Sequence, residues 1–386
     1  MVKNKLAAII NATEDNSDFK PLTNTRPIAA LPFAGRYRII DFVLSNISHA
    51  GIDSTALFIG DSGRSLYDHI RSGDAWDLDS QIKGGIFTFS QQNWKLSMHI
   101  EQEHVDFYYN HRIYLSRSNA KYVFVTGSKI IANIDIAALQ KQHIESGKDV
   151  TLVYKPSLKS AIGANHVKEK NLKFDENHNV IDLVENDKCD EGEIVNASLG
   201  MYLLSIETLN EIIDQAIEDD FYSNIDEVLQ HYLLSYSVNT FEYTGFTANI
   251  NSIENYYKAN MDMLTRSNFA ALFHTSLPIL TKTKNGSPTY YSKDSNVKQS
   301  IVASGAFLAG DVECSVIHRR VSVKEGAIVK NSMILQGTEI GENARVEYAI
   351  IDKDCVVEPG AEIVGTPDNI VVIGKNTLVE AEGARI

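Results

Sequence analysis

Residues 1–265 alternate short continuous apolar runs with segments whose apolar residues recur at helical spacing. Lys5–Asn11 and Lys121–Thr126 are runs typical of buried strands, and the apolar residues of Ile39–Ala50 indicate a helix that stops at Gly51. The same criteria predict strands at Ser54–Gly60 and Asp149–Lys155, helices at Glu103–Ser118, Ile134–Ser146 and Ser252–Phe273, and a hairpin over Asn171–Glu185. Such alternation predicts an α/β fold whose mostly parallel sheet is covered by helices on both faces.

The apolar period changes beyond residue 294. Isoleucine or valine recurs every five or six residues, with small residues, Gly or Asn between, at Ile317, Val323, Ile328, Ile334, Ile340, Val346, Ile351, Val357 and Ile363. A hexapeptide repeat of this kind predicts a β-helix. Pro278, Gly286 and Pro288 lie among polar residues just before it and indicate a linker. We therefore expect domains at 1–265 and 294–386, joined by a linker at 266–293.

Composition excludes several classes of protein. The 386 residues are 44% hydrophobic and 22% charged, which is ordinary for a globular chain. The apolar runs are far shorter than the ~18 residues that span a membrane, and the N-terminus does not resemble a signal peptide. With only 3 cysteines and no C-x-x-C pair, we expect a reducing, cytoplasmic location. A net charge of −14 disfavours nucleic acid as a partner.

One segment carries a family resemblance. Phe19–Gly51 has the sequence FKPLTNTRPIAALPFAGRYRIIDFVLSNISHAG, which resembles the bacterial glucose-1-phosphate adenylyltransferases, or ADP-glucose pyrophosphorylases. Further matching blocks are Gln91-Gln92, Val123–Gly127, Leu183–Glu185, Ser198–Tyr202 and Ile253–Asn260, so the resemblance covers nearly the whole chain. It implies a Rossmann-like nucleotidyltransferase domain of the GT-A-like type, followed by a left-handed parallel β-helix. It also implies a reaction that makes ADP-glucose and pyrophosphate from ATP and glucose 1-phosphate, for glycogen synthesis.

The loop that should hold the triphosphate departs from the family pattern. The family has a Gly-rich G-G-x-G-T-R-L loop after its first strand, where backbone N–H groups and an Arg meet the phosphates. Here Asn11–Asp18 has no Gly and no Arg, and it carries the acids Glu14, Asp15 and Asp18, which would repel a triphosphate. We expect a solvated loop, with contact to a partner subunit as the alternative.

The carboxylates that hold Mg²⁺ in the family are also replaced. Ser128, followed by Lys129, stands where the family strand ends in A-G-D, and Asn249 stands at the second metal Asp. Neutral Ser and Asn oxygens are poor substitutes for carboxylates around a hard cation. The resemblance therefore predicts a lost Mg²⁺ site and no cofactor.

The sugar-phosphate positions are partly kept. Glu185 remains, but Asn186 replaces the family's phosphate-holding Lys, and the G-T-A-D block has Glu103 in place of its Gly. We expect the outline of a substrate cleft to survive in Gln91, Gln92, Asp106, Gly127, Glu185, Ser198 and Gly200. No catalytic residue is expected, since Ser128, Asn249, Asn186 and Glu103 are all lost positions.

All of these losses affect residues that the family uses in one reaction, while the other family motifs are kept. The resemblance then implies a regulatory, catalytically deficient subunit that joins and activates the catalytic subunit in a heterotetramer, so whether this chain alone is an enzyme stays uncertain. The alternatives are a weakly active enzyme in its own right, and a hexapeptide-repeat acyltransferase, with His318 as its base, or a scaffold.

Arginines form the candidate regulatory site. In the family, the region of Arg26, Arg36 and Arg38 helps to bind anionic regulators such as sugar bisphosphates or AMP, and Arg319 and Arg320 on the β-helix would add to such a pocket. Arg suits phosphate because its donors form a fixed fork. The alternative is that some of these side chains pair with acids such as Asp41 and only hold the fold together.

Overall fold

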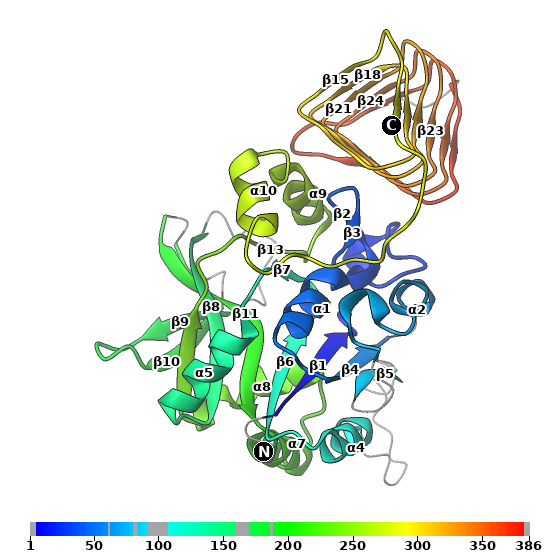
Figure 1. Cartoon of the computed structure of the whole chain (residues 1–386). Helices are drawn as coiled ribbons and strands as arrows, with labels where there is room; N and C mark the ends of the chain where they lie inside the picture. The colour runs from blue at the N-terminus through cyan, green and yellow to red at the C-terminus, as the bar shows by residue number, and fades with distance from the viewer. Residues whose placement is uncertain are drawn as a thin grey trace. The chain divides into compact units, whose positions relative to one another are not determined.

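The structure is a computed structural model that describes residues 5–60, 62–79, 84–91, 107–159, 170–185, 188–190 and 192–381. The chain divides into two compact units, whose elements are labelled in Figure 1. Unit 1 comprises Met1–Asp15, Phe42–Asn251 and Leu277–Leu280, and unit 2 comprises Asn16–Asp41, Ser252–Ser276 and Thr281–Ile386. These units cut the chain differently from boundaries at 265 and 294, because segment 16–41 packs within unit 2. The domain boundaries themselves stay a prediction.

Unit 1 contains a nine-stranded sheet. Its strands are β1 (Leu6–Ala12), β4 (Ser54–Ile59), β5 (Gly85–Ser90), β6 (Tyr122–Gly127), β8 (Val150–Leu158), β9 (Lys170–Phe174), β10 (Val180–Glu185), β11 (Ile194–Ser205) and β12 (Val238–Glu242). The order is β10-β9-β11-β6-β1-β4-β5, and β8 joins β11 to β12. β1 is parallel to β4 and β6, whereas β11 is antiparallel to β6 and β8. The strands β6, β1, β4 and β5 are therefore parallel, whereas β9, β10 and β11 pair antiparallel, so the sheet is less parallel than predicted. The predicted hairpin is confirmed as antiparallel β9 and β10.

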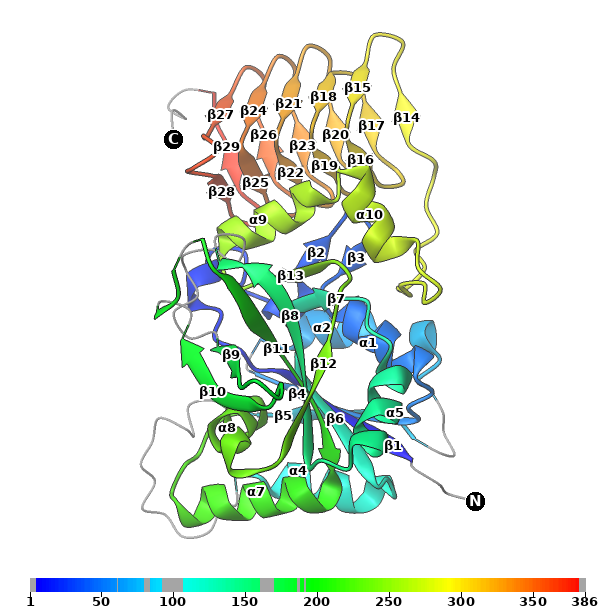
Figure 2. The same ribbon diagram turned by 90° about the vertical axis from the view of Figure 1, so that its left-hand side faces the viewer.

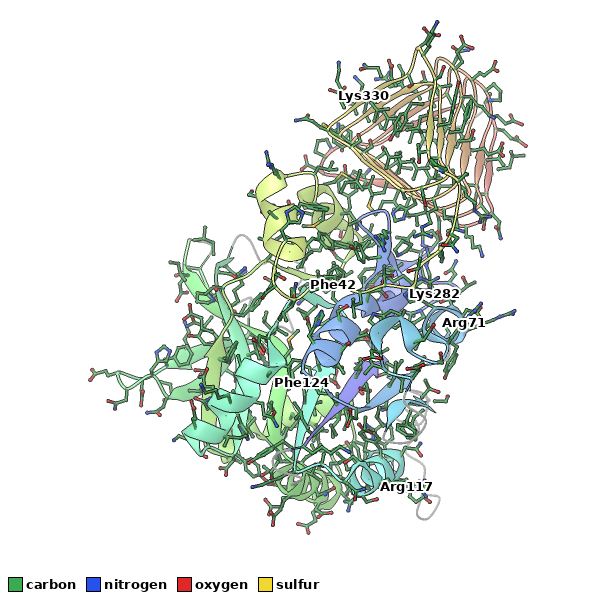
Figure 3. The ribbon with its side chains drawn as sticks, viewed as in Figure 1. Phe42, Arg71, Arg117, Phe124, Lys282 and Lys330 are labelled. Atoms are coloured by element: carbon green, nitrogen blue, oxygen red, sulfur yellow. The ribbon has the colours of Figure 1, made fainter. Side chains whose placement is uncertain are left out.

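Helices cover the sheet on both faces (Figure 2). They are α1 (Ile40–His49), α2 (Arg64–Ile70), α4 (Tyr109–Ser118), α5 (Ile136–Ser146), α7 (Ile206–Glu218) and α8 (Ile225–Tyr232), with 3-10 turns at Asp74–Trp76 and Leu233–Ser235. Apolar residues of α4, α7 and α8 share one core with alternate residues of β1, β4 and β6. Phe124, labelled in Figure 3, lies in the middle of the sheet and is fully buried. Among the described residues, no helix combines the length and apolarity needed to cross a membrane.

Unit 2 contains the predicted left-handed parallel β-helix. Its strands are β14 (Tyr290–Tyr291), β15 (Asn296–Lys298), β16 (Ile301–Val302), β17 (Phe307–Leu308), β18 (Asp311–Glu313), β19 (Val316–Ile317), β20 (Ser322–Val323), β21 (Ile328–Lys330), β22 (Met333–Ile334), β23 (Glu339–Ile340), β24 (Arg345–Glu347), β25 (Ala349–Ile351), β26 (Val356–Val357), β27 (Glu362–Val364), β28 (Val371–Ile373) and β29 (Leu378–Val379). They form one 6-stranded and two 5-stranded parallel sheets, the sides of the triangle visible in Figure 1. Inward residues stack coil upon coil, as Val312, Val329 and Val346 do, so the repeat itself builds the core.

Shorter elements complete unit 2. Hairpin β2 (Pro32–Phe33) and β3 (Tyr37–Arg38) turns through Ala34 and Gly35, both at positive φ, a conformation that suits tight hairpins. A Cβ at Gly35 would also be crowded, because it would lie 3.2 Å from the Ile301 side chain. The 3-10 turns at Ser17–Phe19 and Ile28–Ala30 precede this hairpin.

The helix predicted over Ser252–Phe273 is two helices, α9 (Ile253–Asp262) and α10 (Arg266–Phe273), so that prediction was wrong. Extended backbone at Thr265 interrupts the helical path and begins α10. Ser252 caps α9 by accepting a hydrogen bond from the Asn255 N–H. The predicted linker at 266–293 thus begins with a helix, and its residues 278–289 contain neither helix nor strand.

Candidate functional site

The carboxyl ends of β1 and β6 form one edge of the unit 1 sheet. The two strands are parallel neighbours, and Asn11 pairs with Gly127 in the register. After β1 the chain builds β4 and β5 on one side and then returns to the other side with β6. The sheet order therefore reverses between β1 and β6, and α/β sheets bind their ligands at the carboxyl ends of strands at such a point.

The side chain of Glu14 fills this edge. The Ser128 N–H donates to Glu14 Oε1 at 2.5 Å, and the Ser128 hydroxyl lies 3.0 and 2.9 Å from the two carboxylate oxygens. Ser128 is 1% exposed. The expectation of a solvated loop was wrong for Glu14, which is half-buried and turned inward, and right for Asp15 and Asp18, which are exposed.

A second carboxylate, from Asp226 in the first turn of α8, faces the same space. Asn11 Nδ2 donates to Asp226 Oδ1 at 2.7 Å. A Cβ built on Gly127 would lie 3.1 Å from Glu14 Oε1 and 3.9 Å from Asp226 Oδ2. Desolvation by burial raises the pKa of both carboxyl groups, and the charge of Asp226 adds to the rise for Glu14. Sequence analysis missed Asp226, since an acid in the first turn of a helix is an ordinary structural feature.

Polar side chains tie the loop after β1 to the start of α8. Asn224 Oδ1 accepts hydrogen bonds from Thr13 Oγ1 at 2.9 Å and from Gln91 Nε2 at 3.2 Å. Gln91 was predicted as part of the cleft and is 7% exposed. The predicted cleft residues Gln92 and Asp106 and the lost positions Glu103 and Asn186 lie outside the described residues.

The structure brings the two positions of the missing metal carboxylates together. Asn249 ends β13 (Thr247–Asn249) and pairs with Ile130 of β7 (Ile130–Ala132), two residues after Ser128. The Ile250 N–H also donates to the Lys129 carbonyl at 2.9 Å. The residues here fit Mg²⁺ poorly, because the Ser128 hydroxyl is occupied by Glu14 and desolvation disfavours ionised carboxylates. The described residues contain no group of three or more His, Cys, Asp or Glu side chains that could hold a metal.

Glu185, expected on the sugar side of the cleft, lies between two lysines. Its carboxylate is 2.9 Å from Lys170 Nζ and 3.1 Å from Lys188 Nζ. Hydrogen bonds from Lys170 and Lys188 lower the pKa of Glu185. On β11, the Gly200 N–H donates to Ser198 Oγ where the register with β8 shifts, and Gly200 has positive φ. A side chain at Gly200 would therefore be strained.

Arg26, in unit 2, forms a buried ion pair with Asp352. Arg26 Nη2 lies 2.7 Å from both carboxylate oxygens, and the residues are 4% and 2% exposed. The alternative that the arginines pair with acids is therefore confirmed for Arg26, whose partner is Asp352 and not Asp41. Asp41 instead accepts a hydrogen bond from the Arg38 backbone N–H at 2.9 Å.

The remaining candidate arginines gather with two lysines that sequence analysis missed. We call this set the basic cluster; its members are Arg36, Arg38, Lys284, Arg319, Arg320 and Lys353. Desolvation and the charges of neighbouring cations lower the pKa of Lys353 to about 7 and that of Lys284 to about 8. Arg319 donates to the Lys284 carbonyl at 3.2 Å. The lysines lie in the linker and in a separate coil of the β-helix, so no local sequence motif could mark them.

His318 lies beside the basic cluster but is 4% exposed. Burial, with the charges of Lys353, Arg26 and Arg319, lowers its pKa to about 3. A side chain shielded in this way cannot reach a substrate, which argues against its role as the base of an acyltransferase.

Two family models match the chain. The Nucleotidyl transferase model matches residues 15–266, and the model "GlmU-like, C-terminal hexapeptide" matches residues 288–369. The chain is 33% identical over 387 residues to the Glycogen biosynthesis protein GlgD of Bacillus subtilis, covering 99% of each protein. It is 35% identical over 336 residues to the protein of that name from Geobacillus stearothermophilus, covering 85% of this chain and 84% of the relative.

A third relative carries the name of an enzyme. The chain is 27% identical over 372 residues to a Glucose-1-phosphate adenylyltransferase of Bacillus cereus, covering 94% of this chain and 95% of that protein. The matched regions extend through both the sheet of unit 1 and the β-helix of unit 2. The chain therefore belongs to the bacterial glucose-1-phosphate adenylyltransferase family of nucleotidyl transferases, in which it resembles the GlgD proteins.

Proposed function

We propose that this chain is a regulatory, catalytically deficient subunit of glucose-1-phosphate adenylyltransferase. It associates with the catalytic subunit, as a heterotetramer, and activates that subunit in making ADP-glucose from ATP and glucose 1-phosphate for glycogen biosynthesis. The observation that carries the proposal is the contact of Glu14 with Ser128. A carboxylate lies where the reaction needs donors for phosphate, and a hydroxyl stands where it needs a metal ligand.

The missing chemistry supports the loss of turnover. Mg²⁺ bound in such a cleft would neutralise the phosphates and polarise the bond that breaks. Ser128 and Asn249 supply only neutral oxygens, and Glu14 already accepts both hydrogen-bond donors of Ser128. The contact of Glu14 with Ser128 therefore joins the loop after β1 to the end of β6. The two expected metal positions, Ser128 and Asn249, carry no charged ligand.

The basic cluster supports a regulatory role. Arg36 lies close enough to Arg319, and Arg38 and Lys284 lie close enough to Lys353, for their charges to affect one another. Like charges held together are stabilised when an anion enters between them. We propose that a phosphate-bearing regulator binds there, with the basic cluster in place of the predicted set that included Arg26.

The test compares ADP-glucose formation by this chain alone, by the catalytic subunit alone and by their mixture. We expect no activity from this chain alone, co-elution of the two chains, and higher activity in the mixture. Measurable turnover by this chain alone would instead support the alternative of a weakly active enzyme, which the kept Glu185 and Ser198 favour. A mixture that neither co-elutes nor gains activity would overturn the partnership.

A further inference from the structure

The cleft at the ends of β1 and β6 contains a ligand-like group that belongs to the chain itself. Glu14 is the second residue after the end of β1, and Ser128 is the first residue after the end of β6. Both therefore lie at the point of the sheet where the strand order reverses, the usual place for a ligand in an α/β fold.

The contact reproduces how proteins hold a phosphate. Phosphate oxygens in such clefts accept hydrogen bonds from backbone N–H groups and hydroxyls. Glu14 takes the same two kinds of donor, the Ser128 N–H at 2.5 Å and the Ser128 hydroxyl at 2.9 Å. An incoming phosphate would have to displace the carboxylate before it could reach either donor.

Neighbouring contacts fix the loop that carries Glu14. Thr13, the residue before it, donates to Asn224 at 2.9 Å, and Asn224 also receives the Gln91 side-chain amide. There is little space between the carboxylate and the strand, since a Cβ on Gly127 would lie 3.1 Å from Glu14 Oε1. The Asp226 carboxyl group borders the same space, so a phosphate would meet a second acidic side chain even if Glu14 swung aside.

We propose that Glu14 acts as a built-in occupant of this cleft and excludes nucleoside triphosphates and pyrophosphate from it. The inference goes beyond the proposed function, which requires only that turnover is lost. A chain without catalysis could still bind ATP in a vacant cleft, whereas a chain with its own carboxylate in place does not. Such a subunit does not draw ATP away from the catalytic subunit beside it.

The test follows the Ser128 amide by hydrogen exchange in the full-length chain, with pyrophosphate as the probe. This amide reports the cleft of unit 1 separately from the basic cluster of unit 2, whose cationic side chains also attract pyrophosphate. The variants are Glu14→Ala and Glu14→Gln, and the matched control is Asp15→Ala, which removes an exposed charge of the same sign from the next residue.

In the wild type and in Asp15→Ala, we expect a protected Ser128 amide that pyrophosphate does not change. In Glu14→Ala, protection should fall by about tenfold, because the acceptor is gone, and should return when pyrophosphate is added. Glu14→Gln keeps an acceptor oxygen without the charge, so its Ser128 protection should lie between that of the wild type and that of Glu14→Ala. If Glu14→Ala does not fold, Glu14→Gln provides the test.

Either of two results overturns the inference: added pyrophosphate protects Ser128 further in the wild type, or it has no effect in both Glu14 variants. The mixing assay of the proposed function is independent, because it measures activation of the catalytic subunit and not occupancy of this cleft. One proposal can therefore fail while the other stands.

Discussion

Arg26 and Asp352, which are 326 positions apart in the sequence, form an ion pair buried inside unit 2. The pair links the segment before hairpin β2–β3 to a turn of the β-helix. Because Arg26 Nη2 already contacts both oxygens of Asp352 at 2.7 Å, its guanidinium is committed to this carboxylate. The pair is one of the contacts that join segment 16–41 to the β-helix unit, although the segment precedes most of the sheet in sequence.

We expect Arg26→Ala to destabilise the fold by about 3–5 kcal/mol, because it leaves the Asp352 charge buried and unpaired. The double variant Arg26→Met with Asp352→Leu should lose less than either single change, since no charge then remains. Urea unfolding of the single variants Arg26→Met and Asp352→Leu and of the double variant measures this. Equal losses in all three would show that packing, and not the unpaired charge, sets the cost.

His111 of α4 should make the chain acid-sensitive. It is 1% exposed, stacks on Phe58 with ring centroids 3.8 Å apart, and has its pKa lowered to about 3 by burial. The unfolded chain gains this proton near pH 6.5 and the folded chain does not, so stability is present above pH 6.5 and falls as the pH drops toward 3. At pH 5.5 the loss from this group is about 1.4 kcal/mol.

The measurement is the difference in unfolding free energy between pH 7.5 and 5.5. His111→Phe should remove about 1.4 kcal/mol of this difference, whereas the exposed His231→Phe should not. A His111→Phe variant that keeps the full pH dependence would assign the acid sensitivity to other groups.

Sequence periodicity was sufficient for the β-helix and for the central strands, because each core residue there follows from local spacing. It was not sufficient for the break at Thr265, where one residue adopts extended backbone inside a helical pattern. The site was harder still. The sequence shows that Glu14 is acidic, but which donors it meets depends on the neighbouring strand, more than a hundred residues away.

Long-range contacts also hid Asp226 and the two lysines of the basic cluster. Asp226 reaches Asn11 across 215 positions, and Lys353 lies near Arg38 only because the β-helix brings its coil there. The motif comparison found which residues were lost from the family pattern. It did not show that Glu14, an acid of the triphosphate loop, now lies against Ser128.

Restoring the family's carboxylates at the metal positions should not restore turnover. Ser128→Asp places a second carboxylate against Glu14, whose two oxygens now lie 3.0 and 2.9 Å from the Ser128 hydroxyl. The repulsion should destabilise the loop after β1, and Glu14 would still block a triphosphate from the hydrogen-bond donors at position 128. We expect the double variant Ser128→Asp with Asn249→Asp to form no ADP-glucose in a Mg²⁺-containing assay. Appreciable activity would show that the loop after β1 matters less than the metal ligands.

The basic cluster should carry the response to anionic regulators in the mixed complex. Arg36→Ala and Arg319→Ala should each weaken the effect of a sugar bisphosphate or AMP by about tenfold, the loss of one charge-assisted contact. Arg345→Ala is the control, because Arg345 is exposed on β24 and its guanidinium already pairs with Glu347 at 3.0 Å. An unchanged response in both cluster variants would place the regulator elsewhere.

Anion binding at the basic cluster should weaken as the pH rises, chiefly because of Lys353 and to a smaller extent because of Lys284, whose pKa is about 8. Burial and nearby cations lower its pKa to about 7, so at pH 8.5 the ammonium is mostly neutral. A bound anion raises that pKa again, so binding takes up a proton and its affinity falls with increasing pH, by about tenfold per pH unit at most. Sulfate is the suitable probe, because its own charge is constant over this range.

Calorimetric titration at pH 6.5 and 8.5 measures the effect. Lys353→Arg should lose most of this pH dependence, because a guanidinium stays charged, and the rest comes from Lys284, whose pKa is lowered to about 8. Lys330→Arg, on β21 (Figure 3) and paired with Glu313 at 3.2 Å, should behave as the wild type does. In the absence of anion the same lowered pKa makes the folded chain more stable as the pH rises from 7 toward 10.5, since the unfolded chain binds more protons in that window. A wild type whose sulfate affinity is the same at both pH values would show that Lys353 does not face the bound anion.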